Sequence, residues 1–256
     1  MDIKLDMAEV FSSNLPWTDL SNKTILITGA NGFIASYIVK YLDYLNSEFL
    51  MNIHIVCNIR SNIDSSSRLL EIYKEKKATF IVCDVCDLTF ENLKQVDIIF
   101  HAASHASPKY YKTDPVGTLK PNIIGTYNLL DLIKNDTSKE FIFISSGEVY
   151  GALDDEIIDE SSFGFLDPTD VRSCYGESKR MGENICVSYS KQYGIATKIV
   201  RPFHTYGPTL SQNDGRVFAD FIHSAVNQKD IELTSDGQAY RPFCYVTDFI
   251  SGLFFV

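Results

Sequence analysis

The chain has 256 residues, of which 45% are hydrophobic and 22% are charged, and its formal net charge is −10. This size and composition suit a globular protein with a full core and exclude a disordered chain. The negative charge argues against nucleic acid or an anionic membrane as a main partner, because both bind to positively charged surfaces.

The cysteines and the first residues predict a cytoplasmic protein. No stretch approaches the roughly 20 apolar residues of a membrane helix, and residues 1–20 lack the basic start and apolar centre of a signal peptide. The six cysteines fall inside predicted strands and helices, which suits a reducing compartment. Cys83 and Cys86 have no second pair to complete a zinc site, and His101 and His105 have no evident partner ligands, so no metal site is predicted.

Short apolar runs alternate with helical stretches along the first 200 or so residues. The runs predict strands at 24–28, 53–57, 79–83, 97–100, 140–145 and 197–201, each nearly continuous in apolar residues, as in strands covered on both faces. Helices are predicted at 34–45, 114–134 and 176–193. This alternation predicts an α/β fold over residues 1–201, with a doubly wound parallel sheet of the Rossmann type.

The pattern changes after residue 201. Prolines and glycines interrupt it between 202 and 208, a helix is predicted from about 217 to 227, and short strand-like pieces follow at Ile231 and Phe243. Another amphipathic helix begins at Val246. We expect residues 202–256 to begin a smaller substrate-binding region that is cut short at the end of the chain.

A glycine turn directly follows the first strand, where residues 28–35 read Thr-Gly-Ala-Asn-Gly-Phe-Ile-Ala. Gly29 permits a tight turn, Gly32 lets the backbone approach a pyrophosphate, and the helix that begins here offers free N–H groups and its positive dipole end. The turn therefore predicts a dinucleotide site. Its candidate cofactor-binding residues are Gly29, Asn31, Gly32, Phe33 and Ile34.

The end of the second strand leaves the choice between NAD and NADP open. An acidic residue there would bind the ribose hydroxyls of NAD, but the sequence reads Cys57-Asn58, with Arg60 and Arg68 close behind. Asn58 can still hydrogen-bond a ribose, whereas Arg60 could accept the 2′-phosphate of NADP or be an ordinary solvated loop charge. We favour NAD, with NADP as the alternative.

Tyr175 and Lys179 lie four residues apart in a predicted helix and so project from the same face. An ammonium group near the phenol, with a cationic nicotinamide close by, would lower the pKa of Tyr175 toward neutrality. The tyrosine could then take a proton from a sugar hydroxyl while hydride leaves the same carbon. The strand at 140–145 runs into a Ser-Ser-Gly-Glu segment, whose serine could hydrogen-bond the same oxygen at the carboxyl edge of the sheet.

At this point the chain resembles the extended short-chain dehydrogenase/reductase family of NAD-dependent sugar epimerases and dehydratases, most of all its UDP-glucuronate decarboxylase branch. The likeness runs from residue 23 to the end. The segments that carry it are 101–108, 120–126, 172–179, 213–217 and 241–248.

The resemblance implies a role for residues in each part of the site. It makes Ser146, Tyr175 and Lys179 the oxidation triad and Glu148 the active-site glutamate. In the cofactor cleft it implies Asp84 at the adenine and further contacts from Val85, Ala102, Ala103 and Ser104. The other candidate cofactor-binding residues are Asn58 and Arg60, from the end of the second strand, and Tyr175 and Lys179. For the substrate it implies Ser107, Arg172, His204, Arg216, Val217 and Arg241. An ordinary surface salt bridge is the other interpretation of Arg216 and Arg241.

Two positions depart from the family pattern. Gly147 stands where the 4,6-dehydratases carry an aspartate that protonates the departing hydroxyl, which disfavours dehydration. His204 replaces an asparagine that helps to seat the substrate. A histidine there could bind a phosphate, titrate near neutrality or simply pack in a turn.

The predicted function is oxidation of a sugar at carbon 4 with bound NAD or NADP, followed by decarboxylation of a UDP-uronic acid. The alternatives are a nucleotide-sugar 4-epimerase, a 4,6-dehydratase, and a binding protein that keeps the dinucleotide fold without turnover. The resemblance also implies a homodimer that pairs through the helices at 114–134 and 176–193.

Overall fold

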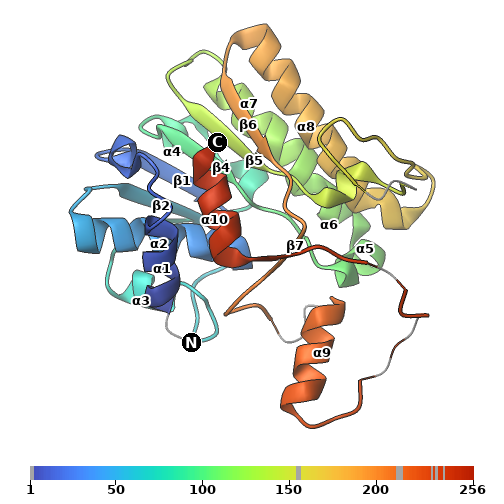
Figure 1. The fold of residues 1–256 in the computed structure, drawn as a ribbon. Helices are drawn as coiled ribbons and strands as arrows, with labels where there is room; N and C mark the ends of the chain where they lie inside the picture. The colour runs from blue at the N-terminus through green and yellow to red at the C-terminus, as the bar shows by residue number, and fades with distance from the viewer. Residues whose placement is uncertain (1–2, 154–156, 212–215, 232, 234–235, 239) are drawn as a thin grey trace.

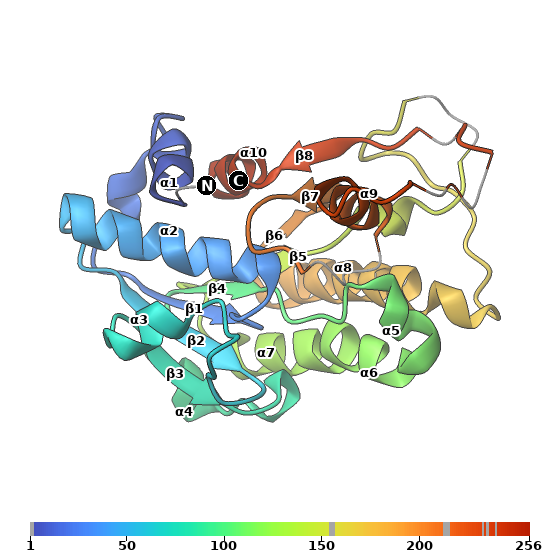
Figure 2. The same ribbon diagram turned by 90° about the horizontal axis from the view of Figure 1, so that it is seen from below.

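A six-stranded parallel sheet forms the centre of the protein, with helices on both faces (Figures 1 and 2). The computed structural model describes residues 3–153, 157–211, 216–231, 233, 236–238 and 240–256. The strand order is β3-β2-β1-β4-β5-β6, which reverses between β1 and β4 and confirms the predicted doubly wound fold. The strands are β1 (Thr24–Thr28), β2 (His54–Ile59), β3 (Thr79–Val82), β4 (Ile98–His101), β5 (Glu140–Ile144) and β6 (Ala196–Val200).

Two hydrophobic cores, one on each face, explain why the strands are continuous in apolar residues. Ile25 and Ile27 of β1 pack on one face and Leu26 on the other, and all three side chains are fully buried. The first face is covered by α1 (Ile3–Phe11), α2 (Phe33–Phe49) and α10 (Val246–Phe255), and the second by α4 (Phe90–Leu93), α7 (Thr126–Ile133) and α8 (Cys174–Tyr193).

The helix predicted at 114–134 is interrupted by a wide turn. It consists of α6 (Pro115–Lys120), the π-helical segment η3 (Pro121–Gly125) and α7. The short helices α3 (Leu70–Lys74) and α5 (Pro108–Thr113) and the 3-10 segments η1 (Trp17–Leu20), η2 (Val85–Asp87), η4 (Gly147–Tyr150) and η5 (Val171–Ser173) complete this part of the chain. None of the helices in the described ranges is both long and apolar enough to cross a membrane.

The residues after β6 form a small second sheet before they return to the main core. β7 (His204–Tyr206) pairs in parallel with β8 (Phe243–Tyr245), and α9 (Val217–Val226) lies between them in the sequence. Ile231 belongs to none of the described strands, and the prediction of a strand-like piece there stays a prediction because residues 232, 234 and 235 lie outside the described residues. Helix α10 packs on α1 and α2, while the domain boundary at residue 201 stays a prediction.

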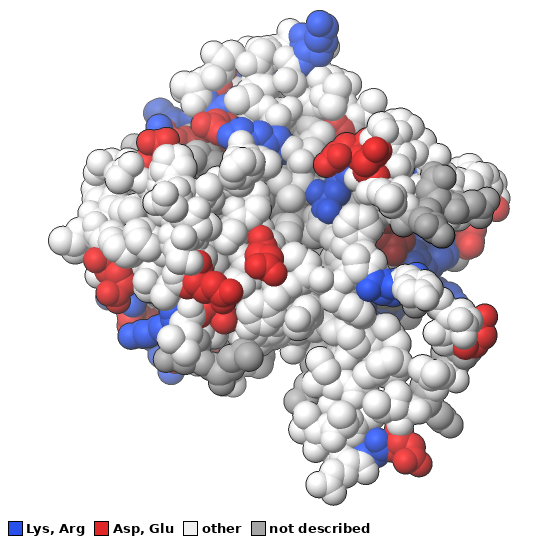
Figure 3. All heavy atoms as spheres, viewed as in Figure 1, with Lys and Arg blue, Asp and Glu red and all other residues white. Residues whose placement is uncertain are grey.

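Charged side chains are scattered over the face of the molecule drawn in Figure 3. Acidic and basic groups alternate there, and the lobe that contains α9 shows few of either sign. On α9, Ile222 and Val226 are exposed. Within the part of this face that the structure describes, no extended basic area of the kind that nucleic acid requires is visible.

Candidate active site

The glycine turn between β1 and α2 depends on positions where a side chain would not fit. Gly29 has φ +62°, and a Cβ added to it would lie 2.7 Å from the Cα of Ala103. The N–H of Gly32 donates to the carbonyl of Gly29 over 2.8 Å, and α2 begins at the next residue. Phe33 and Ile34 line a cavity, so the N-terminus of α2, with its unpaired N–H groups, lies at that cavity.

Asn31, a predicted cofactor-binding residue, instead holds the turn in place. Its Oδ1 accepts a hydrogen bond from the backbone N–H of Arg68 over 2.8 Å. The guanidinium of Arg68 donates to the backbone carbonyl of Asn31 over 3.0 Å and to that of Thr209 over 2.9 Å. Asn31 does not line either of the two cavities described below, and Arg68 connects the turn to the segment after β7.

A buried histidine connects β1, β4 and the wide turn η3. His101 Nε2 donates to the carbonyl of Pro121 over 3.1 Å, so Nδ1 is the acceptor for the hydroxyl of Thr28 over 2.8 Å. The same hydroxyl oxygen accepts from the backbone N–H groups of Ala102 and Ala103, each over 3.2 Å. Burial, together with the nearby Lys179 charge, lowers the pKa of His101 to about 3 and keeps the imidazole neutral.

We expect the free energy of unfolding to fall as the pH is lowered from about 6.5 toward 3. In this range the unfolded chain protonates His101 and the folded chain does not, so the stability lost is up to about 1.4 kcal/mol per pH unit. Urea unfolding of the wild type and of His101→Gln at several pH values measures this slope. The slope should be smaller in His101→Gln, and the exposed-residue control His54→Gln should match the wild type. Equal slopes in all three proteins would contradict the prediction.

A smaller cavity of about 260 Å³ lies at the carboxyl ends of β1, β2 and β3. It brings together most of the predicted cofactor-binding residues, namely Gly29, Gly32, Asn58, Arg60, Asp84, Val85, Ala102, Ala103 and Ser104. The amide nitrogen of Asn58 donates to the carbonyl of Cys83 over 3.0 Å. Asp84 accepts from the N–H of Cys86 over 2.9 Å, and this hydrogen bond is the main cause that lowers the pKa of Asp84.

A larger cavity of about 750 Å³ shares Gly32, Ala102 and Ser104 with the smaller one, so the two form one cleft. It contains all four predicted catalytic residues and most of the predicted substrate residues: Ser146, Glu148, Tyr175, Lys179, Arg172, His204, Arg216 and Arg241. Ser107 and Val217 do not line it. The Asn213-Asp-Gly part of the family likeness lies outside the described residues.

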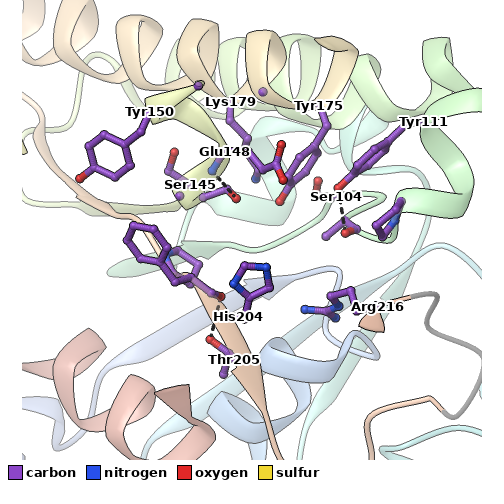
Figure 4. Close-up of a pocket in the computed structure, with 18 of the residues that line it drawn as sticks. Ser104, Tyr111, Ser145, Glu148, Tyr150, Tyr175, Lys179, His204, Thr205 and Arg216 are labelled. Atoms are coloured by element: carbon purple, nitrogen blue, oxygen red, sulfur yellow. Dashed lines mark hydrogen bonds between the residues drawn. The ribbon is translucent and has the colours of Figure 1, made fainter. Parts of the chain in front are cut away.

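Tyr175 and Lys179 project from the first turns of α8 into the larger cavity, facing His204 and Arg216 (Figure 4). The ring of Tyr175 stacks on that of Tyr111, with 4.9 Å between centroids. Lys179 Nζ donates to the backbone carbonyl of Ile144 over 2.6 Å and lies 5.8 Å from the centroid of the Tyr175 ring.

Burial dominates the protonation of this pair. It raises the pKa of Tyr175 to about 12, opposed by a hydrogen bond from Ser146 and by the charge of Arg216. It also lowers the pKa of Lys179 to about 7. Lys179 is bound to a backbone carbonyl, and Arg216 is the cation that lowers the pKa of Tyr175 within the protein alone. The prediction that Lys179 and a cationic nicotinamide together lower this pKa concerns the cofactor-bound site and stays a prediction.

The two serines after β5 face different partners. Ser145 Oγ donates to Glu183 Oε1 over 2.5 Å. Ser146 hydrogen-bonds to Tyr175, and its Oγ also accepts from the N–H of Glu148 over 3.2 Å. Ser146 is thus the serine that can share a substrate oxygen with the tyrosine, as the family resemblance implies.

Glu148 and Arg172 form an ion pair at the mouth of the cavity, with 3.3 Å between Oε2 and Nη1. Both side chains are about two-fifths exposed, so solvent weakens the pair and leaves each group free to rearrange around a ligand. The guanidinium of Arg172 also lies 4.8 Å from the centroid of the Tyr111 ring. This arrangement places a carboxylate and a cation within reach of one substrate.

His204 and Arg216 lie on the side of the cavity opposite Tyr175 (Figure 4), and Arg241 also lines the cavity. Burial and the charges of Arg241 and Arg216 lower the pKa of His204, so the imidazole is neutral at pH 7. Its Nδ1 is buried and has no hydrogen-bond partner among the described residues. A neutral histidine between two arginines can donate to or accept from an uncharged group, while the arginines suit a diphosphate.

Gly147 has no room for the aspartate of a dehydratase. A Cβ added there would lie 2.8 Å from two ring carbons of Phe203, which packs over the backbone of η4. The ring of Phe203 in turn stacks on Tyr150, with 5.9 Å between centroids. An aspartate at position 147 would therefore require the ring of Phe203 to move.

The aromatic residues of the cavity are not among those predicted from the sequence. Tyr111 supports the ring of Tyr175, and Tyr150 and Phe203 cover the far wall. The paired tyrosines at 110 and 111 are the signal that could have found the first of these. The spacing of residues does not indicate which aromatic side chain will meet another from a different segment of the chain.

Comparison with known proteins agrees with this geometry. Residues 25–256 match the NAD dependent epimerase/dehydratase family. Over 239 residues, the chain is 36% identical to UDP-glucuronic acid decarboxylase 5 of Arabidopsis thaliana, covering 91% of this chain and 66% of the relative. It is 34% identical over 237 residues to UDP-glucuronic acid decarboxylase 1 of Xenopus tropicalis, covering 92% and 54%. The chain thus spans about two thirds or less of the length of these relatives.

Solved structures give a similar result. UDP-N-acetylglucosamine 4-epimerase from Methanobrevibacter ruminantium, in complex with UDP-N-acetylmuramic acid, has a TM-score of 0.76 at 28% identity, covering 90% of this chain and 71% of that one. UDP-glucuronic acid 4-epimerase from Bacillus cereus, in complex with UDP-glucuronic acid and NAD, has a TM-score of 0.70 at 26% identity, covering 89% and 70%.

Proposed function

The chain belongs to the NAD-dependent epimerase/dehydratase family, and on that premise we propose that it oxidises carbon 4 of UDP-glucuronate and releases the carboxyl group as carbon dioxide. The proposal rests on the convergence of Ser146, Tyr175 and Lys179 in a cavity that continues into the glycine-turn cleft. The similarity to UDP-glucuronic acid decarboxylases supports the choice of substrate.

The residues of the cleft fit NAD. Gly29 lies close to Ala103, and α2 begins after Gly32 with no side chain capping its first N–H groups. Both features suit a pyrophosphate, which binds to backbone N–H groups that no side chain covers. Lys179 would hold the end of the dinucleotide nearest the sugar. When bound, NAD would supply a hydride acceptor at C4 that gives the same hydride back, so there would be no net redox change.

Burial raises the pKa of the Tyr175 phenol to about 12, and a cationic nicotinamide bound beside it would lower that pKa. Tyr175 could then take the proton of the C4 hydroxyl while Ser146 holds the same oxygen by a hydrogen bond. The C4 ketone is β to the carboxylate on C5, so the C5–carboxyl bond breaks as its electrons move into the carbonyl and carbon dioxide leaves. The enolate oxygen then lies between Tyr175 and Ser146, which stabilise its charge. A proton from solvent would add to C5 and restore the C4 ketone. C4 would then regain its hydride while Tyr175 gives its proton back to the oxygen, which yields the pentose. Arg172, Arg216 and Arg241 are the cations available for the carboxylate and the diphosphate.

Incubation of the chain with UDP-glucuronate and NAD tests this proposal. We expect equal amounts of carbon dioxide and a UDP-linked pentose, measured by gas trapping and NMR. A panel of UDP-, dTDP-, CDP- and GDP-sugars serves as the comparison. Turnover without carbon dioxide, or turnover of other sugars only, would reject decarboxylation of UDP-glucuronate.

Epimerisation at C4 is the second candidate, because it begins with the same oxidation and the structural relatives include 4-epimerases. UDP-galacturonate formed without carbon dioxide would favour it. Dehydration is disfavoured, because Phe203 occupies the space that an acid at position 147 would need.

A homodimer through α6–α7 and α8 is also proposed. These helices expose Val116, Ile124, Tyr127, Met181 and Val187, each between 47% and 71% exposed. Such a group of apolar side chains on two packed helices suits a four-helix interface with a second copy. We also propose a cytoplasmic location, since all six cysteines are free thiols.

Ile124→Glu is expected to convert the dimer to a monomer, because it places a charge at the centre of the apolar face. Light scattering after size exclusion should show the mass fall from twice 28.9 kDa to 28.9 kDa. Ile222→Glu on α9, a similarly exposed apolar position outside this face (55% against 47% for Ile124), should leave the dimer intact. A monomeric wild type would refute the interface.

A further inference from the structure

The adenosine end of the cleft carries no acidic side chain at the end of β2. Asn58 pairs in register with Thr28, and its carbonyl accepts from the N–H of Ala30, so it lies directly beside the glycine turn. An Asp or Glu near the end of the second strand bonds the ribose hydroxyls of NAD, and its charge would repel a 2′-phosphate. Asn58 is uncharged, and its amide nitrogen donates to the carbonyl of Cys83. That source of repulsion is missing here.

Arg60, two residues further on, brings a positive charge to the same cavity. It is exposed and lines the smaller cavity together with Asn58 and Gly29. Its Nη1 donates to His105 Nε2 over 2.8 Å. The imidazole of His105 packs against the ring of Tyr110 in a tilted arrangement, with 4.7 Å between centroids and 30° between the planes, which supports the acceptor.

The partner of the Arg60 guanidinium is neutral. A nitrogen that accepts from an arginine carries no proton, and burial and the Arg60 charge both lower the pKa of His105. No ion pair joins Arg60 to a carboxylate of the described chain within 4.0 Å. The guanidinium is therefore held in place without being neutralised, and its remaining N–H groups can bind a phosphate in a fork.

Asp84 is the one carboxylate among the described residues that line the smaller cavity. It accepts from the N–H of Cys86, and its Oδ2 lies 3.9 Å from Lys120 Nζ. The charge of Arg60 also contributes to lowering the pKa of Asp84. Two cations thus offset one carboxylate, and the balance of charge in this part of the cleft favours an added anion.

We propose that Arg60 is a specificity-determining residue that binds the 2′-phosphate of NADP, so that this chain takes NADP at least as well as NAD. This inference rests on the proposed function, since it concerns the adenosine end of the same cofactor cleft. It goes beyond the family likeness, whose name and relatives point to NAD. NADP brings the same nicotinamide to the catalytic residues, so the reaction proposed above is unchanged.

Calorimetric titration of the 256-residue chain with NAD and with NADP, without substrate, tests the proposal. The wild type should bind NADP at least as tightly as NAD. Arg60→Ala should weaken NADP about tenfold or more, the value of one charge-assisted contact, and change the affinity for NAD less than twofold. The pair 2′,5′-ADP and 5′-ADP should show the same difference, with no nicotinamide involved.

Lys74→Ala is the matched control, because it removes an exposed cation from α3, which does not line the cleft. It should alter neither affinity. Arg60→Lys keeps the positive charge but cannot donate two parallel hydrogen bonds to a phosphate, so it should bind NADP with intermediate affinity. A wild type that prefers NAD, or an Arg60→Ala that weakens both dinucleotides alike or neither, would overturn the assignment. If neither dinucleotide bound at all, the proposed function itself would fall with it.

Discussion

Tyr175→Phe is expected to lower kcat with UDP-glucuronate by about 10²- to 10⁴-fold, the usual contribution of a positioned acid–base group. The substitution removes the hydroxyl that takes the proton from C4 and keeps the ring, whose stacking on Tyr111 does not need the oxygen. Because the loss concerns proton transfer, the affinity for the dinucleotide should change little. Steady-state kinetics and calorimetry measure the two quantities separately.

The control for this prediction is Tyr193→Phe, at the far end of the same helix. Its hydroxyl accepts a hydrogen bond from the side chain of Gln192 and does not line the cavity, so activity should be unchanged. If Tyr175→Phe retained wild-type turnover, the phenol would not be the proton acceptor, and the assignment of the oxidation to this residue would be wrong.

Arg201→Met should lower the free energy of unfolding by about 3 kcal/mol, because it leaves a largely buried carboxylate without its cation. The guanidinium binds Glu183 in a fork, with Nε to Oε1 at 2.9 Å and Nη2 to Oε2 at 2.7 Å. Ser145 donates to the same carboxylate. The arrangement fastens α8, which carries the catalytic tyrosine, to the ends of β5 and β6.

Two further variants test whether the loss of stability comes from leaving the Glu183 carboxylate buried without its cation. Arg201→Met with Glu183→Leu should regain most of the lost stability, because the buried charge is removed together with its partner. Lys198→Met breaks an ion pair of 2.9 Å with Glu140 whose side chains are about two-fifths exposed, and should cost about 1 kcal/mol or less. Urea unfolding measures all three. A double variant less stable than Arg201→Met alone would contradict the argument.

The strands and the glycine turn could be predicted because their signals are local. A run buried on both faces must be apolar throughout, and a turn that meets Ala103 at 2.7 Å must be glycine. The meeting of Tyr175 with Ser146 followed from the topology, since the ends of parallel strands share one edge of the sheet.

What could not be predicted depends on contacts between distant segments. Ser145 and Ser146 both line the cavity, and Glu183 of α8 decides which hydroxyl is left for a substrate, because it accepts that of Ser145. The side chain of Asn31 accepts a hydrogen bond from the backbone of Arg68, and Lys179 donates to the carbonyl of Ile144. The pairing of β7 with β8 joins segments on either side of α9, and short strands of three residues leave little pattern to read.

The wide turn η3 between α6 and α7 determines how the helical segment responds to a change in its length. A π turn holds one residue more than the α-helical path between the same ends, and the carbonyl of Pro121 accepts from His101 there. Deleting one residue within the π turn would let a regular α-helix join the same two ends, so Leu129 and Leu130 would keep their places in the core. Deleting one residue from a regular stretch of the helix would instead rotate everything that follows by about 100° and turn these leucines out of the core. Variation in chain length by a single residue is therefore best absorbed where the backbone is most irregular.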